Sequence, residues 1–187
     1  MTKYLLLLLT LLIATPAIAA EQYVEKGMHL RIVSPDGKYA VSDNDGGYVQ
    51  VVDTQTGQTV QAFGTPDGWP YFFMGYGNAI SNTGIVVGEL GNDDMDTAVY
   101  GDITTGEVTP LACPDEWGAN QAMGITPDGS VICGYVTNYS APLEGTAKVA
   151  AIWVKGDDGL YGDCQLLPVP EKDWACTIPY MIEAHWI

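Results

Sequence analysis

The residues best suited to chemistry are carboxylates grouped in short, turn-rich segments. Asp93, Asp94 and Asp96 stand together in ELGNDDMD at 89–96. Carboxylate oxygens are the hard ligands that Ca²⁺ prefers, so these residues could hold calcium. Two carboxyls with different pKa values in one cleft could instead cleave a glycoside. The spacing matches no established calcium loop, and solvated turns are the alternative interpretation.

Aromatic side chains form the second candidate set. The candidates are Trp69, Trp117 and Trp174, which end the segments PDGW, PDEW and PEKDW, and Tyr71, which lies two residues after Trp69. An exposed aromatic face can stack on a ligand or contact a partner. A buried one would pack between neighbouring structural units, which its fixed place in the sequence also fits.

A repeat of about 45 residues positions both sets. The matching segments are IVSPDGKYAVS at 32–42, AISNTGIVVG at 79–88 and GITPDGSVICG at 124–134. Each has an apolar residue, then Ser or Thr, then a turn with Gly, then a β-rich run. A second match joins VVDTQTGQTV at 51–60 to VYGDITTGEV at 99–108.

Short runs rich in Val, Ile and Tyr between Gly turns predict an all-β chain. Each unit fits four strands, and for the first unit we expect them at about 28–34, 38–43, 47–53 and 58–63. Four strands per 45-residue unit are typical of a β-propeller blade. A β-sandwich of serial hairpins is the alternative.

We therefore predict a partial β-propeller of about three four-stranded blades plus the first strand of a fourth. The expected units are 28–64, 74–113, 120–168 and 180–187. The last residues, MIEAHWI, match the beginning of a unit, which favours the interpretation that the chain is truncated. The expected domains are then a signal peptide at 1–20 and an incomplete propeller at 21–187.

The segments NAISNTGIVVGEL, MGITPDGSVICGY and TAVYGDITTGEVTPL resemble the extracellular HAF-type repeats, which are β-propeller-like repeats of exported bacterial proteins. The resemblance covers roughly residues 28–187. The tripeptide that names these repeats reads TAV at 97–99 and VAA at 149–151 here. The resemblance implies a propeller and export. It is tied to no reaction and implies no catalytic residue.

Residues 1–20 are typical of a secretory signal peptide, with Lys3, an apolar run at 5–13 and AIA at 17–19. The apolar run is too short to span a bilayer. The net charge of −16 argues against nucleic acid and anionic membrane partners. We expect a secreted, periplasmic or cell-surface protein that is not inserted in a membrane once the signal peptide is cleaved.

The four cysteines are Cys113, Cys133, Cys164 and Cys176, and they allow three pairings. Cys133 lies in the apolar run SVICGYV, where it fits a small buried side chain. The sequence alone leaves the pairing open, and we expect disulfides to contribute little. Apart from the possible calcium, no cofactor is expected.

Connections in a four-stranded meander alternate between two ends of the sheet. The two–three loops at 42–47, 89–96 and 137–146 should therefore share one surface with the loops between units, which are expected to carry Trp69, Tyr71, Trp117 and Trp174. The sequence shows no phosphate loop or nucleophile elbow. It favours a secreted or cell-surface binding module for a protein or glycan over an enzyme. The alternatives are a propeller glycosidase or lyase with its active site in further C-terminal blades, and a structural repeat without a small ligand.

Overall fold

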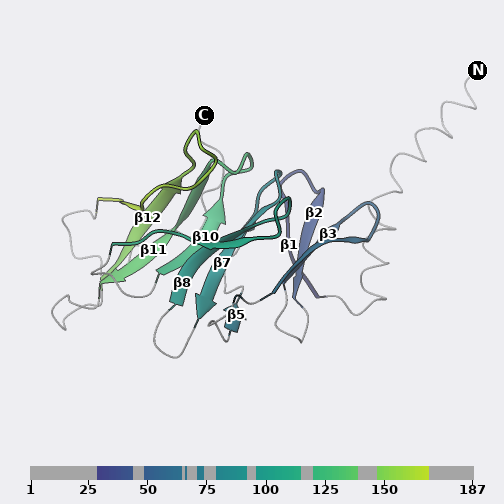
Figure 1. Cartoon of the computed structure of the whole chain (residues 1–187), viewed down its shortest axis with the longest axis horizontal. Coiled ribbons are helices and arrows are strands. Elements are labelled where there is room, and N and C mark those ends of the chain that lie inside the picture. Colours follow the sequence, from purple (N-terminus) through teal and green to yellow (C-terminus); the bar gives the residue numbers. More distant parts are fainter. Residues whose placement is uncertain are drawn as a thin grey trace, which may run out of the picture.

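A computed structural model describes residues 29–43, 49–64, 66, 71–73, 79–91, 96–114, 120–138 and 147–168. These residues form only strands, turns and connecting segments, so the all-β prediction is confirmed for them. The strands build three antiparallel sheets, which follow one another along the long axis of the molecule (Figure 1). No helix in the described ranges is long and apolar enough to span a membrane. The segments 1–20 and 180–187, expected as signal peptide and fourth unit, lie outside the described residues.

The first sheet is a simple meander in which each strand pairs with the next along the chain. Its strands are β1 (His29–Val33), β2 (Tyr39–Asp43), β3 (Val49–Asp53) and β4 (Thr59–Phe63). Their bounds lie within two residues of the strands expected for the first unit.

The second sheet differs from this plan at its first strand. Its strands are β5 (Tyr71–Phe73), β6 (Ala79–Ile80), β7 (Ile85–Gly91), β8 (Asp96–Asp102) and β9 (Val108–Pro110). Both β5 and β6 pair with β7, so two short strands share the first position. Tyr71 was expected in a connecting loop, and this was wrong: its backbone opens β5 and pairs with Gly91.

The third sheet repeats the meander of the first. Its strands are β10 (Asn120–Ile125), β11 (Val131–Asn138), β12 (Ala147–Val154) and β13 (Gln165–Leu166). The two longest strands, β11 and β12, pair along their whole length.

The repeated Ser or Thr and Gly have a structural cause in the turns between first and second strands. The hydroxyl accepts the N–H that opens the next strand, at 3.0 Å each time: Ser34 from Tyr39, Ser81 from Ile85, Thr126 from Val131. The glycine has a φ of 74°, 85° or 75°, at Gly37, Gly84 and Gly129. Only glycine adopts this left-handed backbone without strain.

The sheets are held face to face by two apolar clusters. Alternate side chains of a strand point to opposite faces. Val86 of β7 packs with Val41 and Phe63 of the first sheet, whereas Val87 packs with the third sheet. Both faces of β7 are thus covered, and every one of its residues is buried.

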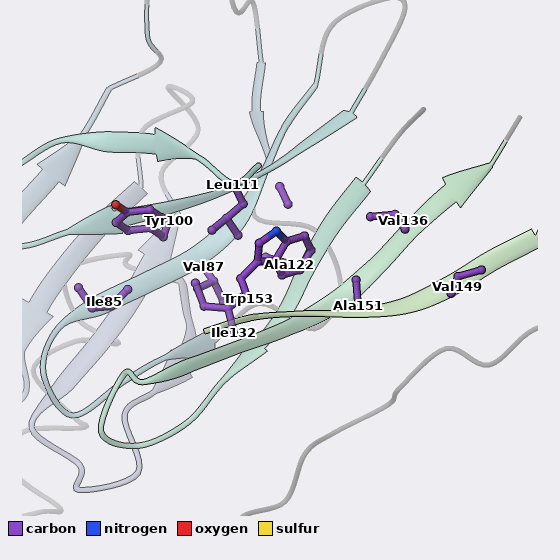
Figure 2. Packing of buried hydrophobic residues seen from close by; sticks show 11 residues of the cluster. Ile85, Val87, Tyr100, Leu111, Ala122, Ile132, Val136, Val149, Ala151 and Trp153 are labelled. Atoms are coloured by element: carbon purple, nitrogen blue, oxygen red, sulfur yellow. The ribbon is translucent and has the colours of Figure 1, made fainter. Parts of the chain in front are cut away.

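Trp153 is the largest fully buried side chain among the described residues, and it lies between the second and third sheets among Val87, Leu111 and Ile132 (Figure 2). Its indole Nε1 donates a hydrogen bond of 2.7 Å to the carbonyl oxygen of Ala112. A buried indole needs such a partner for its N–H. The third sheet is therefore tied to the segment that follows β9.

The turns between first and second strands lie in a row. The Asp36 N–H donates to Asn82 Oδ1 at 2.9 Å, and the Asn82 N–H donates to the Pro127 carbonyl at 2.8 Å. We call this side of the sheets the turn end. Since strands alternate in direction, the connections β2–β3, β7–β8 and β11–β12 leave from the opposite side, the loop end. These connections, 44–48, 92–95 and 139–146, are themselves outside the described residues.

Candidate functional site

Most of the residues proposed from sequence to bind a ligand or a metal ion lie outside the part of the chain that the structure describes. These are Trp69, Trp117, Trp174, Asp93 and Asp94. Asp96 is exposed as the first residue of β8, and Tyr71 is described only through its backbone. In the described ranges, no three His, Cys, Asp or Glu side chains are grouped so as to hold a metal ion.

A different candidate site in the structure is centred on Glu89. It lies on the same side of β7 as Ile85 and Val87, two members of the core shared with the third sheet. An apolar residue would be expected there, yet the position holds a carboxyl that is only 8% exposed. A charged group is rarely buried without partners, so its surroundings decide its role.

A chain of hydrogen bonds leads from Glu89 into the third sheet. Gln121 Nε2 donates to Glu89 Oε2, and Tyr135 Oη donates to Gln121 Oε1 at 2.8 Å. Lys148 Nζ donates to Tyr135 Oη at 3.1 Å and also lies 4.2 Å from the centroid of the tyrosine ring. We call these four residues the polar chain.

The register of the third sheet positions three members of the polar chain. Gln121 and Tyr135 are direct partners across β10 and β11, so their side chains leave the sheet on the same side. Tyr135 pairs with Ala150, and Lys148 lies two residues before it on that face of β12. The antiparallel pairing thus places the side chains of Gln121, Tyr135 and Lys148 next to one another on one face of the sheet.

Burial raises the pKa of the Glu89 carboxyl from its ordinary 4.5 to about 7, and the negative charge of Asp96 acts in the same direction. The positive charge of Lys148 opposes both. Glu89 therefore gains or loses its proton near neutral pH. Carboxyls with such environments are common where proteins bind or transform ligands.

The polar chain lies close to the loop end. Glu89 is two residues from the end of β7, and Lys148 is the second residue of β12. Nearby, Asn120 Oδ1 accepts the backbone N–H of Ala98 at 2.5 Å, which ties β10 to β8. Charged and polar side chains from two sheets are thereby held together at the loop end.

Sequence reasoning missed this site. It placed Glu89 in a loop at 89–96, whereas the residue is within β7, and it singled out none of the three partners. One signal was present: in the run IVVGE, glutamate follows Ile85 and Val87 at the alternating positions of a buried face. Its partners depend on the packing of β10 against β7, which no local pattern reveals.

No family model matches this chain, and no curated protein matches it. Among solved structures, it is similar to the hydrazine synthase of Kuenenia stuttgartiensis, with 20% identity and a TM-score of 0.47. The similarity covers 73% of this chain and 41% of that one, so this chain spans less than half of that protein's length. Both fold and function therefore rest on the residues described above.

Proposed function

We propose that the three sheets are successive blades of a partial β-propeller of an exported protein, as the resemblance to HAF-type repeats implies. Three features support this. The sequence repeats about every 45 residues, each sheet packs face to face on the next, and the turns at Asp36, Asn82 and Pro127 are hydrogen-bonded in a row. Radial repetition of this kind is how propellers are built.

We further propose that the protein is a secreted, periplasmic or cell-surface module that binds a protein or glycan at the loop end. The observation that carries this proposal is the polar chain from Glu89 to Lys148. It brings a carboxyl, an amide, a phenol and an ammonium group together between the second and third sheets. Apolar side chains alone would be enough to pack the two sheets together at this position. Hydroxyl-rich ligands and polar protein surfaces offer matching donors and acceptors.

The candidates from sequence belong to the same proposal. Trp69, Tyr71, Trp117 and Trp174 would supply apolar surface for the partner. Asp93, Asp94 and Asp96 would carry the acidic charge of the loop end and could hold Ca²⁺.

Glycan-array and pull-down binding of the exported chain test the proposal, with two matched lysine variants. Lys148 lies at the loop-end side of β12, and Lys155 follows the other end of the same strand. We expect Lys148→Gln to weaken binding about tenfold or more, since a charged hydrogen bond contributes roughly 1.5–3 kcal/mol. Lys155→Gln should bind as the unaltered protein does. Equal loss in both variants, or no binding to any glycan or protein, would contradict the proposal.

A glycosidase or lyase is the second candidate, and one observation favours it. Glu89 has a pKa of about 7, and the Asp96 carboxylate contributes to that shift. Two carboxyls whose environments separate their pKa values can divide the roles of acid and base. Under this hypothesis Glu89→Gln lowers the rate of polysaccharide cleavage by a factor of roughly 10²–10⁴. Binding without any cleavage by the unaltered protein would exclude this candidate and leave the binding module standing.

A further inference from the structure

Cys113 and Cys164 are far apart in sequence but lie together in the structure. Cys113 follows β9 of the second sheet, and Cys164 precedes β13 of the third. Both pack against the apolar cluster between these sheets. Both also line one surface pocket of about 280 Å³, together with Pro114 and Asp163. The two thiols therefore face the same space from different sheets.

Each cysteine is held in place by its neighbours. On the second sheet, the Leu111 N–H donates to the Ala98 carbonyl at 2.8 Å, and the Ala112 carbonyl accepts from Trp153 at 2.7 Å. These bonds fix the chain immediately before Cys113.

The segment around Cys164 is anchored on both sides. Before it, Tyr161 Oη donates to the Gly129 carbonyl at 2.6 Å, and the Tyr161 ring lies edge-on to Tyr100 with centroids 4.8 Å apart. After it, Gln165 pairs with Ile152 in the sheet. Cys164 is therefore held between two anchored residues, Tyr161 and Gln165.

The two thiols are close enough for each to affect the pKa of the other. Burial raises the pKa of Cys113 to about 11, with the neighbouring Cys164 acting in the same direction, and burial also raises the pKa of Cys164. Catalytic and redox-sensing thiols have the opposite property, a lowered pKa. The pair thus has the character of a structural cross-link rather than of a reactive nucleophile.

We propose that Cys113 and Cys164 form a disulfide that covalently joins the second sheet to the third when the folded chain meets a low-molecular-weight disulfide. This selects one partner choice from the pairings that the sequence leaves open, and it replaces the expectation that disulfides contribute little. Cys133 does not take part, because it is buried within β11.

The reaction is two thiol–disulfide exchanges. One thiol loses its proton, attacks the external disulfide and forms a mixed disulfide, and one external thiol leaves. The second protein thiol loses its proton and attacks the protein sulfur of the mixed disulfide, so that the second external thiol leaves. The two cysteines are oxidised by two electrons, and the external disulfide is reduced to two thiols that take up the two protons. Disulfides form and persist in oxidising export compartments.

The test uses the full chain, first reduced and then incubated folded with hydroxyethyl disulfide, a neutral oxidant that the Asp163 carboxylate does not repel. Alkylation under denaturing conditions and peptide mapping by mass spectrometry then identify the linked cysteines. We expect the peptides containing Cys113 and Cys164 to be joined, with Cys133 recovered as a thiol. The variant Cys176→Ser should give the same link, and it controls for the fourth cysteine.

A link from Cys113 or Cys164 to Cys133 or Cys176 in place of the expected one would overturn the proposal. So would mixed disulfides that persist on both cysteines without a link. The rate of linking should rise about tenfold per pH unit between pH 7 and 9, because thiolates are the attacking species and their fraction is small there.

Thermal unfolding gives an independent readout. We expect the oxidised chain to unfold about 10 °C above the reduced chain, since the bond closes a loop of about fifty residues. The double variant Cys113→Ser/Cys164→Ser should not respond to the oxidant. An unchanged or lower unfolding temperature of the linked protein would show that the bond strains the fold and would overturn the structural role proposed here.

Discussion

Carboxylates at the turn end and at the loop end have opposite environments. At the turn end, the Thr126 hydroxyl donates to Asp128 at 2.6 Å and the Ser130 hydroxyl at 2.8 Å. These hydrogen bonds lower the pKa of Asp128 to about 2. At the loop end, burial and the charge of Asp96 raise the pKa of Glu89 to about 7.

The two carboxyls differ in how far along the sequence their hydrogen-bond partners lie. Asp128 is bonded to residues two positions away, within one exposed turn. Glu89 is bonded to Gln121, 32 positions away and in another sheet. The carboxylate of Asp128 thus finds its hydrogen-bond partners within its own turn. The loop end keeps a titrating group at a junction between sheets, where a change in pH near neutrality changes its charge.

The largest loss of stability is expected from adding a Cβ at Gly134, which lies beside Tyr135 of the polar chain. A Cβ at this position would collide with the backbone carbonyl of Gln121, so β10 and β11 would have to separate. We expect Gly134→Ala to lower the free energy of unfolding by roughly 3–5 kcal/mol, as severe core disruptions do. Urea unfolding measures the change.

Gly37→Ala at the turn end is the matched control. A Cβ there meets nothing within 4 Å, and only the φ of 74° is unfavourable. The cost should be about 1 kcal/mol. Equal costs for the two alanines would contradict the close packing of β10 on β11.

An intermediate effect is expected from Glu89→Gln, read as a change in pH dependence. The folded-state pKa of about 7 lies above the ordinary 4.5. Below pH 4.5 the carboxyl is protonated in both states and its contribution is fully present. Between pH 4.5 and 7 the unfolded chain releases the proton first, so stability falls as pH rises.

The fall should be on the order of 2 kcal/mol in the unaltered protein and absent in Glu89→Gln. Urea unfolding at a series of pH values gives the difference between the two proteins. A curve for the unaltered protein that parallels the variant's across this window would place Glu89 in an ordinary, solvated environment.

The smallest effect is expected at Asp128. Its folded-state pKa of about 2 lies below the ordinary 3.8, so its contribution is present above pH 3.8 and lost as pH falls toward 2. Asp128→Asn should cost less than about 1 kcal/mol at neutral pH, because the group is exposed and solvent screens it. A loss comparable to that of Gly134→Ala would contradict the local, exposed character of the turn end.

Local patterns account for what was predicted correctly. The Ser or Thr at 34, 81 and 126 and the Gly three residues later determine a turn through neighbours in sequence, and the strand alternation follows from the flanking runs. For this reason the all-β class and the strands of the first unit were predictable.

The remainder depends on contacts between units. The first strand of the second sheet is divided into β5 and β6 because both pair with β7. For this reason Tyr71 lies in a strand, whereas the sequence predicted a loop. The approach of Gln121 to Glu89 and of Cys113 to Cys164 follows from the packing of the third sheet on the second. Neither is encoded in a short motif, so neither could be found by spacing.

The titration of Glu89 tests the central claim most directly, namely that the polar chain at the loop end contains a carboxyl that titrates near neutral pH. Carboxyl ¹³C chemical shifts, measured by NMR against pH, give its pKa. We predict about 7 in the unaltered protein. Asp96→Asn should lower the value, because a repelling charge is removed, and Lys148→Gln should raise it, because a stabilising charge is removed. A pKa near 4.5 that responds to neither substitution would contradict the account.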